Sequence, residues 1–132
     1  MSNKFDQARQ VMDEAVQAAL EAVGIVVEGQ AIELAAIDTG RLKGSITYAT
    51  KTAKSSPRPG PNYTPDERDG VTHDGSDNSV VIGTNVEYAP YVEYGTVHMA
   101  AQPFLRRAIE ITRNDIEEVF ATTIRSKLDG IK

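Results

Sequence analysis

Two long stretches with helical periodicity, one at each end of the sequence, constrain the fold more than any other feature. Over residues 4–37, apolar side chains recur at steps of three and four, which predicts a long amphipathic helix. Gly24 and Gly29 interrupt this stripe. Because a glycine costs about 1 kcal/mol relative to alanine inside a helix, we expect a bend there or two shorter helices. A second stripe begins after Pro103 and runs to about Leu128, which predicts a long C-terminal helix.

Two short segments between these stripes have the composition of β-strands. Residues 45–51 alternate with period two, and residues 79–84 are rich in Val and Ile. The 27 residues between them, 52–78, hold four of the six prolines and exceed the about 12–15 residues of an ordinary loop. We interpret this segment as a flexible hairpin arm, and a surface loop without a role is the alternative. The predicted fold is a single α+β domain over residues 1–132 with a small antiparallel sheet. Its exposed edges favour self-assembly unless residues 95–101 add a third strand.

A tyrosine-rich stretch, residues 85–96, predicts a short helix. Pro90 suits its first turn, and Gly95 suits a left-handed residue at its C-terminal end. Its tyrosines recur every three residues and therefore share one side of the helix. Rings at this spacing either pack against a sheet or form the centre of a protein–protein contact, and both interpretations stay open. The three residues are Tyr88, Tyr91 and Tyr94.

The composition excludes several kinds of site. The chain has no cysteine, so disulfides, thiol nucleophiles and cysteine-ligated metals are excluded. No glycine-rich phosphate loop or calcium-loop spacing is present, and we expect neither a metal nor a cofactor. No uninterrupted apolar run approaches the about 20 residues of a membrane span, and the N-terminus lacks a signal-peptide pattern. The sequence therefore predicts a soluble cytoplasmic domain without membrane contact.

The net charge of −5 is distributed unevenly along the chain. Residues 1–38 carry seven acids and two bases, whereas residues 39–65 carry five bases and no acid. A nucleic-acid-binding protein normally has a larger basic excess. The basic segment is therefore expected to face either a phosphate backbone or the acidic helix of a neighbouring copy. In the second helical stripe, Arg106 with Glu110 and Arg113 with Glu117 have the spacing of i,i+4 ion pairs.

One triplet offers a catalytic interpretation. Asp38, Thr39 and Gly40 resemble the active-site motif of retroviral-type aspartic proteases, in which each subunit of a dimer supplies one aspartate. Here the triplet follows a helical stripe instead of a strand, and Arg41 and Leu42 follow where that family has small and polar residues. The structural interpretation is that Asp38 or Thr39 caps a helical turn that starts near Gly40. We expect no catalytic residue, and a dimeric protease using Asp38 or an oligomeric nucleic-acid-binding module are the alternatives.

Three blocks of sequence resemble the neck or tail-completion proteins of long-tailed bacteriophages, a family related to the minor tail protein Z of phage lambda. After a long N-terminal helix, the blocks read DTGRLKGSI (residues 38–46), VIGTNVEYAPYVEYGT (residues 81–96) and QPFLRRA (residues 102–108). The resemblance implies a structural virion protein, and no enzyme, that sits as a ring between the head connector and the tail tube. It would complete the top of the tail so that the tail can join a DNA-filled head.

The same resemblance implies partners and a location. The partners would be further copies of this chain and other phage neck, head-connector and tail proteins, with DNA only passing through. The location would be the virion, and the host cytoplasm during assembly. We expect the arm 52–78 to order on contact with a neighbouring ring.

The candidate assembly contacts are charged and aromatic side chains that a partner can meet. They are Arg41, Lys43, Lys51, Lys54, Arg58, Tyr88, Tyr91, Glu93, Tyr94, Arg106 and Arg107. A second group is expected to form caps and turns. It consists of Asp38, Thr39, Gly40, Pro90, Gly95 and Pro103.

Overall fold

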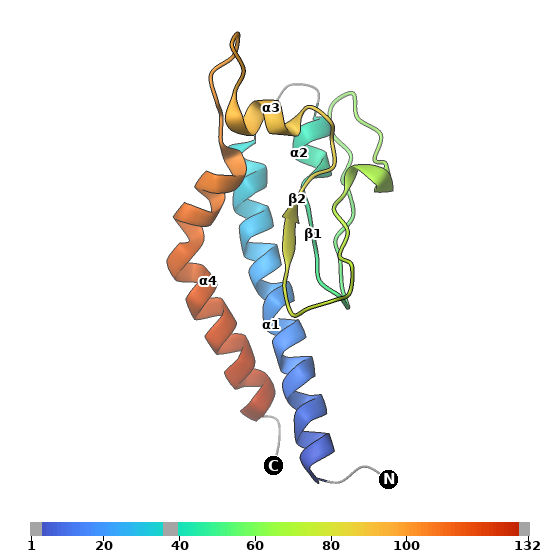
Figure 1. Ribbon diagram of the computed structural model, residues 1–132, viewed down its shortest axis with the longest axis vertical. Helices are drawn as coiled ribbons and strands as arrows, with labels where there is room; N and C mark the ends of the chain where they lie inside the picture. Colours follow the sequence, from blue (N-terminus) through green and yellow to red (C-terminus); the bar gives the residue numbers. More distant parts are fainter. Residues whose placement is uncertain (1–3, 36–39, 130–132) are drawn as a thin grey trace.

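The computed structural model describes residues 4–35 and 40–129 of the chain. Its two long helices, α1 and α4, lie side by side and run in opposite directions, and a small sheet with its loops covers the C-terminal part of α1 (Figure 1). This is the α+β arrangement that the sequence predicts. In chain order the elements are α1 (Lys4–Leu34), α2 (Arg41–Ser45), β1 (Thr47–Ala49), the 3-10 helix η1 (Glu67–Asp69), β2 (Val81–Gly83), α3 (Ala89–Tyr94) and α4 (Phe104–Asp129).

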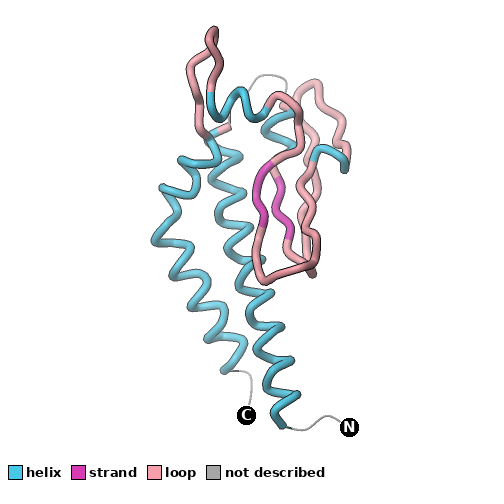
Figure 2. Tube along the Cα trace, viewed as in Figure 1, coloured by secondary structure: helices cyan, strands magenta, loops and turns pink. Residues whose placement is uncertain are grey.

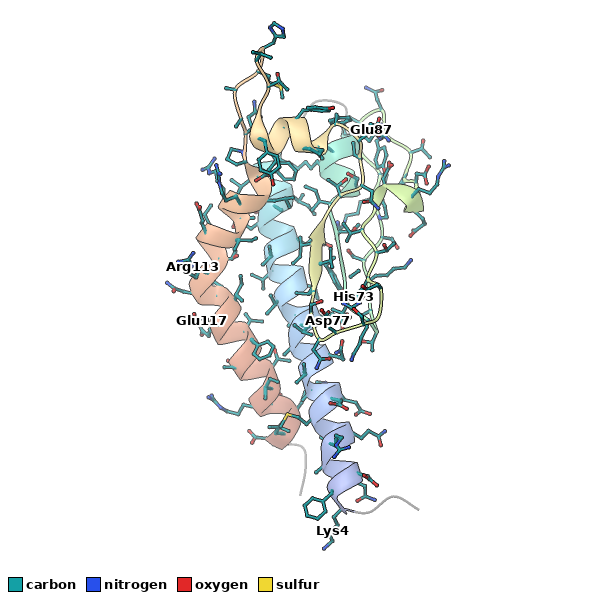
Figure 3. All side chains as sticks on the ribbon, in the orientation of Figure 1. Lys4, His73, Asp77, Glu87, Arg113 and Glu117 are labelled. Carbon is teal, nitrogen blue, oxygen red and sulfur yellow. The ribbon has the colours of Figure 1, made fainter. Side chains whose placement is uncertain are left out.

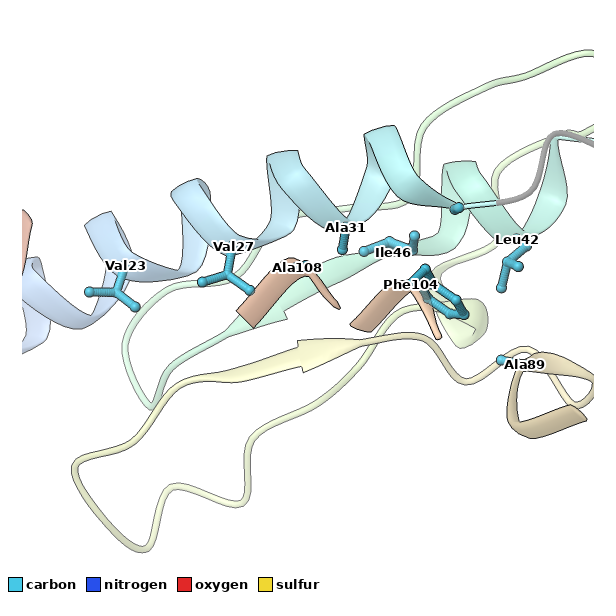
Figure 4. Packing of buried hydrophobic residues seen from close by; sticks show 9 residues of the cluster. Val23, Val27, Ala31, Leu42, Ile46, Ala89, Phe104 and Ala108 are labelled. Atoms are coloured by element: carbon cyan, nitrogen blue, oxygen red, sulfur yellow. The ribbon is translucent and has the colours of Figure 1, made fainter. Parts of the chain in front are cut away.

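The core lies between α1, α4 and the short elements at the end of α1. Small and β-branched side chains at four-residue steps form the buried side of α1, where they let α4 approach closely. Phe104 of α4 is 1 % exposed and is the largest fully buried side chain among the described residues. Figure 4 shows it beside Leu42 and Ile46. Burial of one such side chain contributes about 1.5–3 kcal/mol. The buried α1 residues are Ala15, Ala19, Val23, Val27 and Ala31.

Helix α1 is continuous from Lys4 to Leu34, so it is not divided into two shorter helices at its glycines. Gly24 faces the sheet, and a Cβ placed on it would lie 2.9–3.0 Å from ring and Cβ atoms of Tyr48. Gly24 therefore allows β1 to pack directly on the helix backbone. A Cβ on Gly29 would meet nothing within 4 Å.

Both predicted strands are present, and both are shorter than the sequence pattern suggests. Strands β1 and β2 pair antiparallel with Thr47 opposite Gly83 and Ala49 opposite Val81. After Ala49 the chain turns, because the Thr50 hydroxyl accepts the backbone N–H of the residue three positions later. The sheet has two strands among the described residues. Residues 95–101 add no third strand to it.

The segment 52–78 joins the two strands as a long hairpin, but it folds back on the body of the protein instead of standing away from it (Figure 2). The Ser55 N–H donates to the Tyr48 carbonyl (3.0 Å), and the Arg58 N–H donates to the Gly44 carbonyl (2.8 Å). A Cβ on Gly44 would overlap the Arg58 carbonyl oxygen, so glycine is required for this approach. The flexibility of the segment and its ordering on assembly stay predictions.

The turn residues lie largely where the sequence places them. Gly40 has a φ of 88° and precedes the predicted helical turn, which is α2. Pro90 lies in the first turn of α3. Gly95 ends α3 with a φ of 80°, but its ψ of 173° is extended and not left-handed helical. Pro103 directly precedes α4, and its carbonyl accepts the Arg107 N–H (3.0 Å). The predicted caps Asp38 and Thr39 lie outside the described residues.

By length and composition alone, one described helix, α1, could cross a membrane. In its most apolar 18-residue window, 39 % of the residues are buried inside the protein. A core helix of a protein that lies outside any membrane can have the same length and composition, so this criterion alone does not identify a membrane span. The absence of membrane contact stays a prediction.

Candidate assembly surfaces

Arg41 is the centre of an ionic cluster at the end of the molecule where α2 and α3 meet. Its guanidinium donates two hydrogen bonds to the Glu87 carboxylate (2.9 and 3.0 Å) and further bonds to Asp69 (3.2 and 3.4 Å). It also lies 5.9 Å from the centroid of the Tyr88 ring, within the range of a cation–π contact. The hydrogen bonds that Arg41 donates to Asp69 and Glu87 raise the pKa of Arg41 above its ordinary value. The pKa of Glu87 is lowered by its own backbone N–H and by Arg41.

This cluster also anchors the segment 52–78. Asp69 is buried and accepts a third donor, the Tyr63 hydroxyl, at 2.9 Å. Burial is the main cause that raises the pKa of Tyr63. Arg41 therefore joins α2, η1 and the residues before α3, and Figure 3 shows Glu87 at this end of the molecule. The contacts that Arg41 makes are therefore within its own chain.

A second ionic contact holds the same segment against α1. Glu28 of α1 is 4 % exposed, and its carboxylate accepts hydrogen bonds from the Arg58 guanidinium and the Ser55 hydroxyl. Arg58 also donates to the Ile46 carbonyl (3.3 Å). The sequence predicts that the basic segment faces either a phosphate backbone or the acidic helix of a neighbouring copy. In the structure, Arg58 meets the acidic helix of its own chain.

Sequence reasoning missed the polar face of α1. Gln17, Glu21, Gly24 and Glu28 recur at steps of four, three and four, the spacing of one helix face. Glu21 on this face accepts the Tyr48 hydroxyl (3.0 Å). This spacing is visible in the sequence, but a search for apolar periodicity alone does not detect a polar helix face.

The remaining predicted cations lie on the surface. Lys54 is 3.9 Å from Glu67, and both side chains are exposed, so this pair contributes little to stability. Lys43 is half-buried and Lys51 is exposed. No carboxylate in the described part of the chain lies within 4 Å of either ammonium group, so both stay candidate contacts.

The three tyrosines of the α3 region were expected either to pack against the sheet or to form a protein–protein contact, and they differ in burial. Tyr88 is half-buried and packs against the core. Tyr91 is 58 % exposed and Tyr94 is 78 % exposed. One ring therefore faces inward and two face solvent, as expected for a surface that can meet a partner.

A tip that sequence reasoning did not single out lies next to these rings. Residues 95–102 project from the end of the molecule (Figure 1). The tip is closed by a pair of hydrogen bonds between Thr96 and Met99 (2.8 and 3.3 Å). Val97 is 98 % exposed and Met99 is 39 % exposed, and residues 94–105 include no Lys, Arg, Asp or Glu. We call Tyr91, Tyr94, Val97 and Met99 the apolar tip. Exposed apolar groups gathered in this way are typical of contact surfaces.

Glu93 differs from its predicted place on a contact surface. It is 8 % exposed, and its carboxylate accepts the backbone N–H groups of Leu105 (2.9 Å) and Arg106 (3.1 Å). It therefore caps the N-terminus of α4, where a negative charge is favourable. The Arg106 and Arg107 side chains are exposed on the first turn of α4.

The predicted i,i+4 ion pairs of α4 are not formed. In the described residues, neither Arg106 with Glu110 nor Arg113 with Glu117 lies within 4 Å. Figure 3 shows Arg113 and Glu117 on the outer side of α4. The arginines of this helix therefore keep their charges available to a partner.

The described residues contain no group of three or more His, Asp or Glu side chains arranged to hold a metal ion. His73 has a 3 % exposed side chain; its Nδ1 accepts the Gly75 N–H (2.8 Å), and its Nε2 lies 3.0 Å from the Ser79 hydroxyl. This arrangement stabilises the turn at the end of the hairpin, next to Asp77 (Figure 3). Asp38, the residue of the protease alternative, lies outside the described part of the chain.

Comparison with known proteins agrees with the resemblance read from the sequence. A family model described as "Bacteriophage HK97-gp10, putative tail-component" matches residues 1–95, from the N-terminus through α3. No curated protein and no solved structure matches the chain. The match confirms the resemblance to phage neck and tail proteins, whereas the relation to the lambda Z protein stays a prediction. With well over half of its length matched, this chain belongs to the HK97-gp10-like family of phage tail components.

Proposed function

We propose that this chain is a structural protein of the phage neck that forms a ring, completes the top of the tail and joins it to the DNA-filled head. The observation that carries the proposal is the apolar tip. Its Tyr91 and Tyr94 rings on α3 and its Val97 and Met99 side chains on the projecting loop are exposed and uncharged. Tyrosine and methionine are enriched at the centres of protein–protein contacts, and a closed tip loses little conformational entropy on binding.

The distribution of charge supports assembly over catalysis. Arg41 and Arg58, the two arginines of the basic segment, bind carboxylates of their own chain. These contacts hold the hairpin segment in place. Residues 41–45, next to the protease-like triplet, are helical and not a strand-to-turn segment. We therefore propose that the protein is no enzyme.

A ring requires two different faces on each subunit, one meeting the other on the next copy. The exposed tip and the outer surfaces of the two long helices supply such unlike faces. Other neck, head-connector and tail proteins would bind the ends of the ring, and DNA would only pass through it. The protein would lie in the host cytoplasm during assembly and in the virion afterwards.

Electron microscopy of lysates tests this proposal. Deletion of the gene from the phage or prophage that encodes this chain is expected to leave filled heads and separate tails, and the wild-type gene restores joined particles. The variant Tyr94→Ser/Val97→Ser is expected not to restore them. The matched control is Phe5→Ser, an exposed apolar residue (83 % exposed) at the opposite end of the molecule, which is expected to restore joining. Joined particles without the gene would contradict the proposal.

A further inference from the structure

An acidic hollow lies on the surface of α1 beside the start of the hairpin segment. Its volume is about 520 Å³, and it is lined by Asp13, Glu14, Gln17 and Glu21 of α1 and by Lys51, among others. No basic group in the described residues lies within 4 Å of any of its three carboxylates. The hollow therefore has a negative charge that the single Lys51 ammonium does not neutralise.

Gln17, one of the lining residues, also has a buried polar atom without a partner. Gln17 is 9 % exposed; its amide nitrogen donates to Asn78 (2.9 Å), but its Oε1 has no hydrogen-bond partner within the described structure. A buried acceptor without a donor costs about 1–3 kcal/mol. The carboxylates that line the hollow fit a ligand that carries several N–H donors and a positive charge, and the arginine guanidinium has both properties.

The carboxylates next to this amide have a regular spacing. Glu14 and Glu21 are seven residues apart, and Ala18 lies between them on the same face of α1. Seven residues of α-helix span about 10 Å.

Helix α4 carries the complementary pattern. Arg106 and Arg113 are also seven residues apart, and Ile109 lies between them at i+3. Both arginines are exposed, and Ile109 is 50 % exposed. In the described part of the chain, no carboxylate lies within 4 Å of either guanidinium. Two cations flanking an apolar side chain on α4 thus match two anions flanking an apolar side chain on α1.

We propose that α4 of one copy lies along α1 of the next, with Arg106 and Arg113 bound to Glu14 and Glu21 and with Ile109 against Ala18. One guanidinium enters the acidic hollow and donates to its carboxylates. This inference rests on the proposed ring and names the surface through which a second copy binds.

The two patches cannot meet within one chain. Because α1 and α4 are antiparallel, the arginine strip lies beside the C-terminal half of α1, whereas the hollow lies toward its N-terminal half (Figure 1). The contact therefore joins unlike patches of two copies, and a closed ring of more than two identical subunits requires such a contact.

Charge reversal tests the pairing. Arg106→Glu/Arg113→Glu and Glu14→Arg/Glu21→Arg are each expected to raise the concentration needed for self-association at least about tenfold, as measured by light scattering. An equimolar mixture of the two variants is expected to restore association, because each reversed face then meets its complement. Arg125→Glu/Lys127→Glu, with the same charge change farther along α4, is the matched control and is expected to behave as wild type.

Two further measurements separate a loss of the contact from a loss of folding. Glu21 also binds Tyr48, so circular dichroism must show that the α1 variant is folded, and Glu14→Arg alone provides a version without that contact. If the wild type associates and both reversed variants associate equally well, the inference is wrong while the proposed ring stands. If the wild type stays monomeric even with purified tails, the proposed ring fails, and the inference with it.

Disulfide cross-linking gives an independent answer because the chain has no cysteine of its own. In Ala18→Cys/Ile109→Cys, mild oxidation is expected to yield covalent dimers and higher multimers, since a disulfide requires Cα atoms about 4.4–6.8 Å apart. Each single-cysteine variant is the control and is expected to yield no ladder. An assembled double variant that gives no covalent multimers would overturn the pairing.

Discussion

Arg58 reaches from the hairpin segment to Glu28 on α1, and the carboxylate that it meets is 4 % exposed. The Ser55 hydroxyl binds the same carboxylate. A buried carboxylate is tolerated only where donors surround it. This pair therefore fixes the segment 52–78 to the helix, and it removes Arg58 from the set of free surface cations.

Replacing the arginine is expected to destabilise the protein. Arg58→Met leaves Glu28 with one donor in a buried site, and we expect the free energy of unfolding to fall by about 1–3 kcal/mol. Chemical denaturation at neutral pH measures the change. Lys54→Met, which removes a cation from an exposed pair 3.9 Å apart, is the control and should change stability by less than about 1 kcal/mol. Equal effects of the two variants would mean that the Arg58–Glu28 contact contributes no more to stability than the exposed Lys54–Glu67 pair.

Two glycines of α1 should respond in opposite ways to the same substitution. Gly29→Ala is expected to stabilise the protein by up to about 1 kcal/mol, because alanine favours the helix and its Cβ meets nothing within 4 Å. Gly24→Ala is expected to destabilise it, because the new Cβ would lie 2.9 Å from the Tyr48 ring. Thermal melting of both variants provides the comparison. A stabilising Gly24→Ala would mean that β1 does not pack on α1 at this point.

The stability of the protein should fall at alkaline pH through Tyr48. Burial, helped by the hydrogen bond to Glu21, raises the pKa of Tyr48 from 10.0 to about 12. The folded state keeps the phenol proton while the unfolded chain loses it above pH 10, so the stabilisation is complete below about pH 10 and is lost as pH rises toward 12.

Denaturation between pH 9 and 12 tests this dependence, and Tyr48→Phe is the matched variant. The variant should show a shallower loss of stability over this interval. A slope identical to that of the wild type would mean that the Tyr48 hydroxyl is not buried against Glu21.

The carboxylate of Glu93 should stabilise α4 from outside the helix. Glu93→Gln keeps the shape of the side chain but removes its charge, and we expect a loss of about 0.5–2 kcal/mol. Glu110→Gln, an exposed carboxylate in the second turn of α4, is the control and should have little effect. Thermal melts at low and high salt measure both variants, and a loss confined to Glu110→Gln would contradict the assignment.

Local patterns predicted the elements of this fold because they act over a few residues. The apolar stripe of α1, the turn after Gly40 and the first turn of α3 at Pro90 all follow from neighbours along the chain. The continuity of α1 could not be predicted in this way, because Gly24 is explained by its contact with the Tyr48 ring, 24 residues later in the chain. Tertiary packing overrode helix propensity there.

The candidate surfaces were predicted less well for the same reason. A count of charges treats every arginine as available, but Arg58 pairs with a residue 30 positions earlier, and Glu93 caps a helix 12 residues later. The exposure of Val97 depends on how residues 95–102 leave the body, which no periodicity encodes. Lys43 and Lys51 stay candidate contacts, since nothing in their own chain binds their charges in the described residues.

The mass of the purified protein in solution, measured by light scattering over a concentration series with and without purified tails, tests the central claim most directly. The proposed ring predicts one assembly whose mass is a fixed multiple, greater than two, of 14.3 kDa, formed either alone or on the tails. A dimer that grows no further would contradict the ring and would favour a dimeric protease, for which Asp38→Ala would abolish cleavage. A chain that stays monomeric and leaves the tails unbound would contradict the account as a whole.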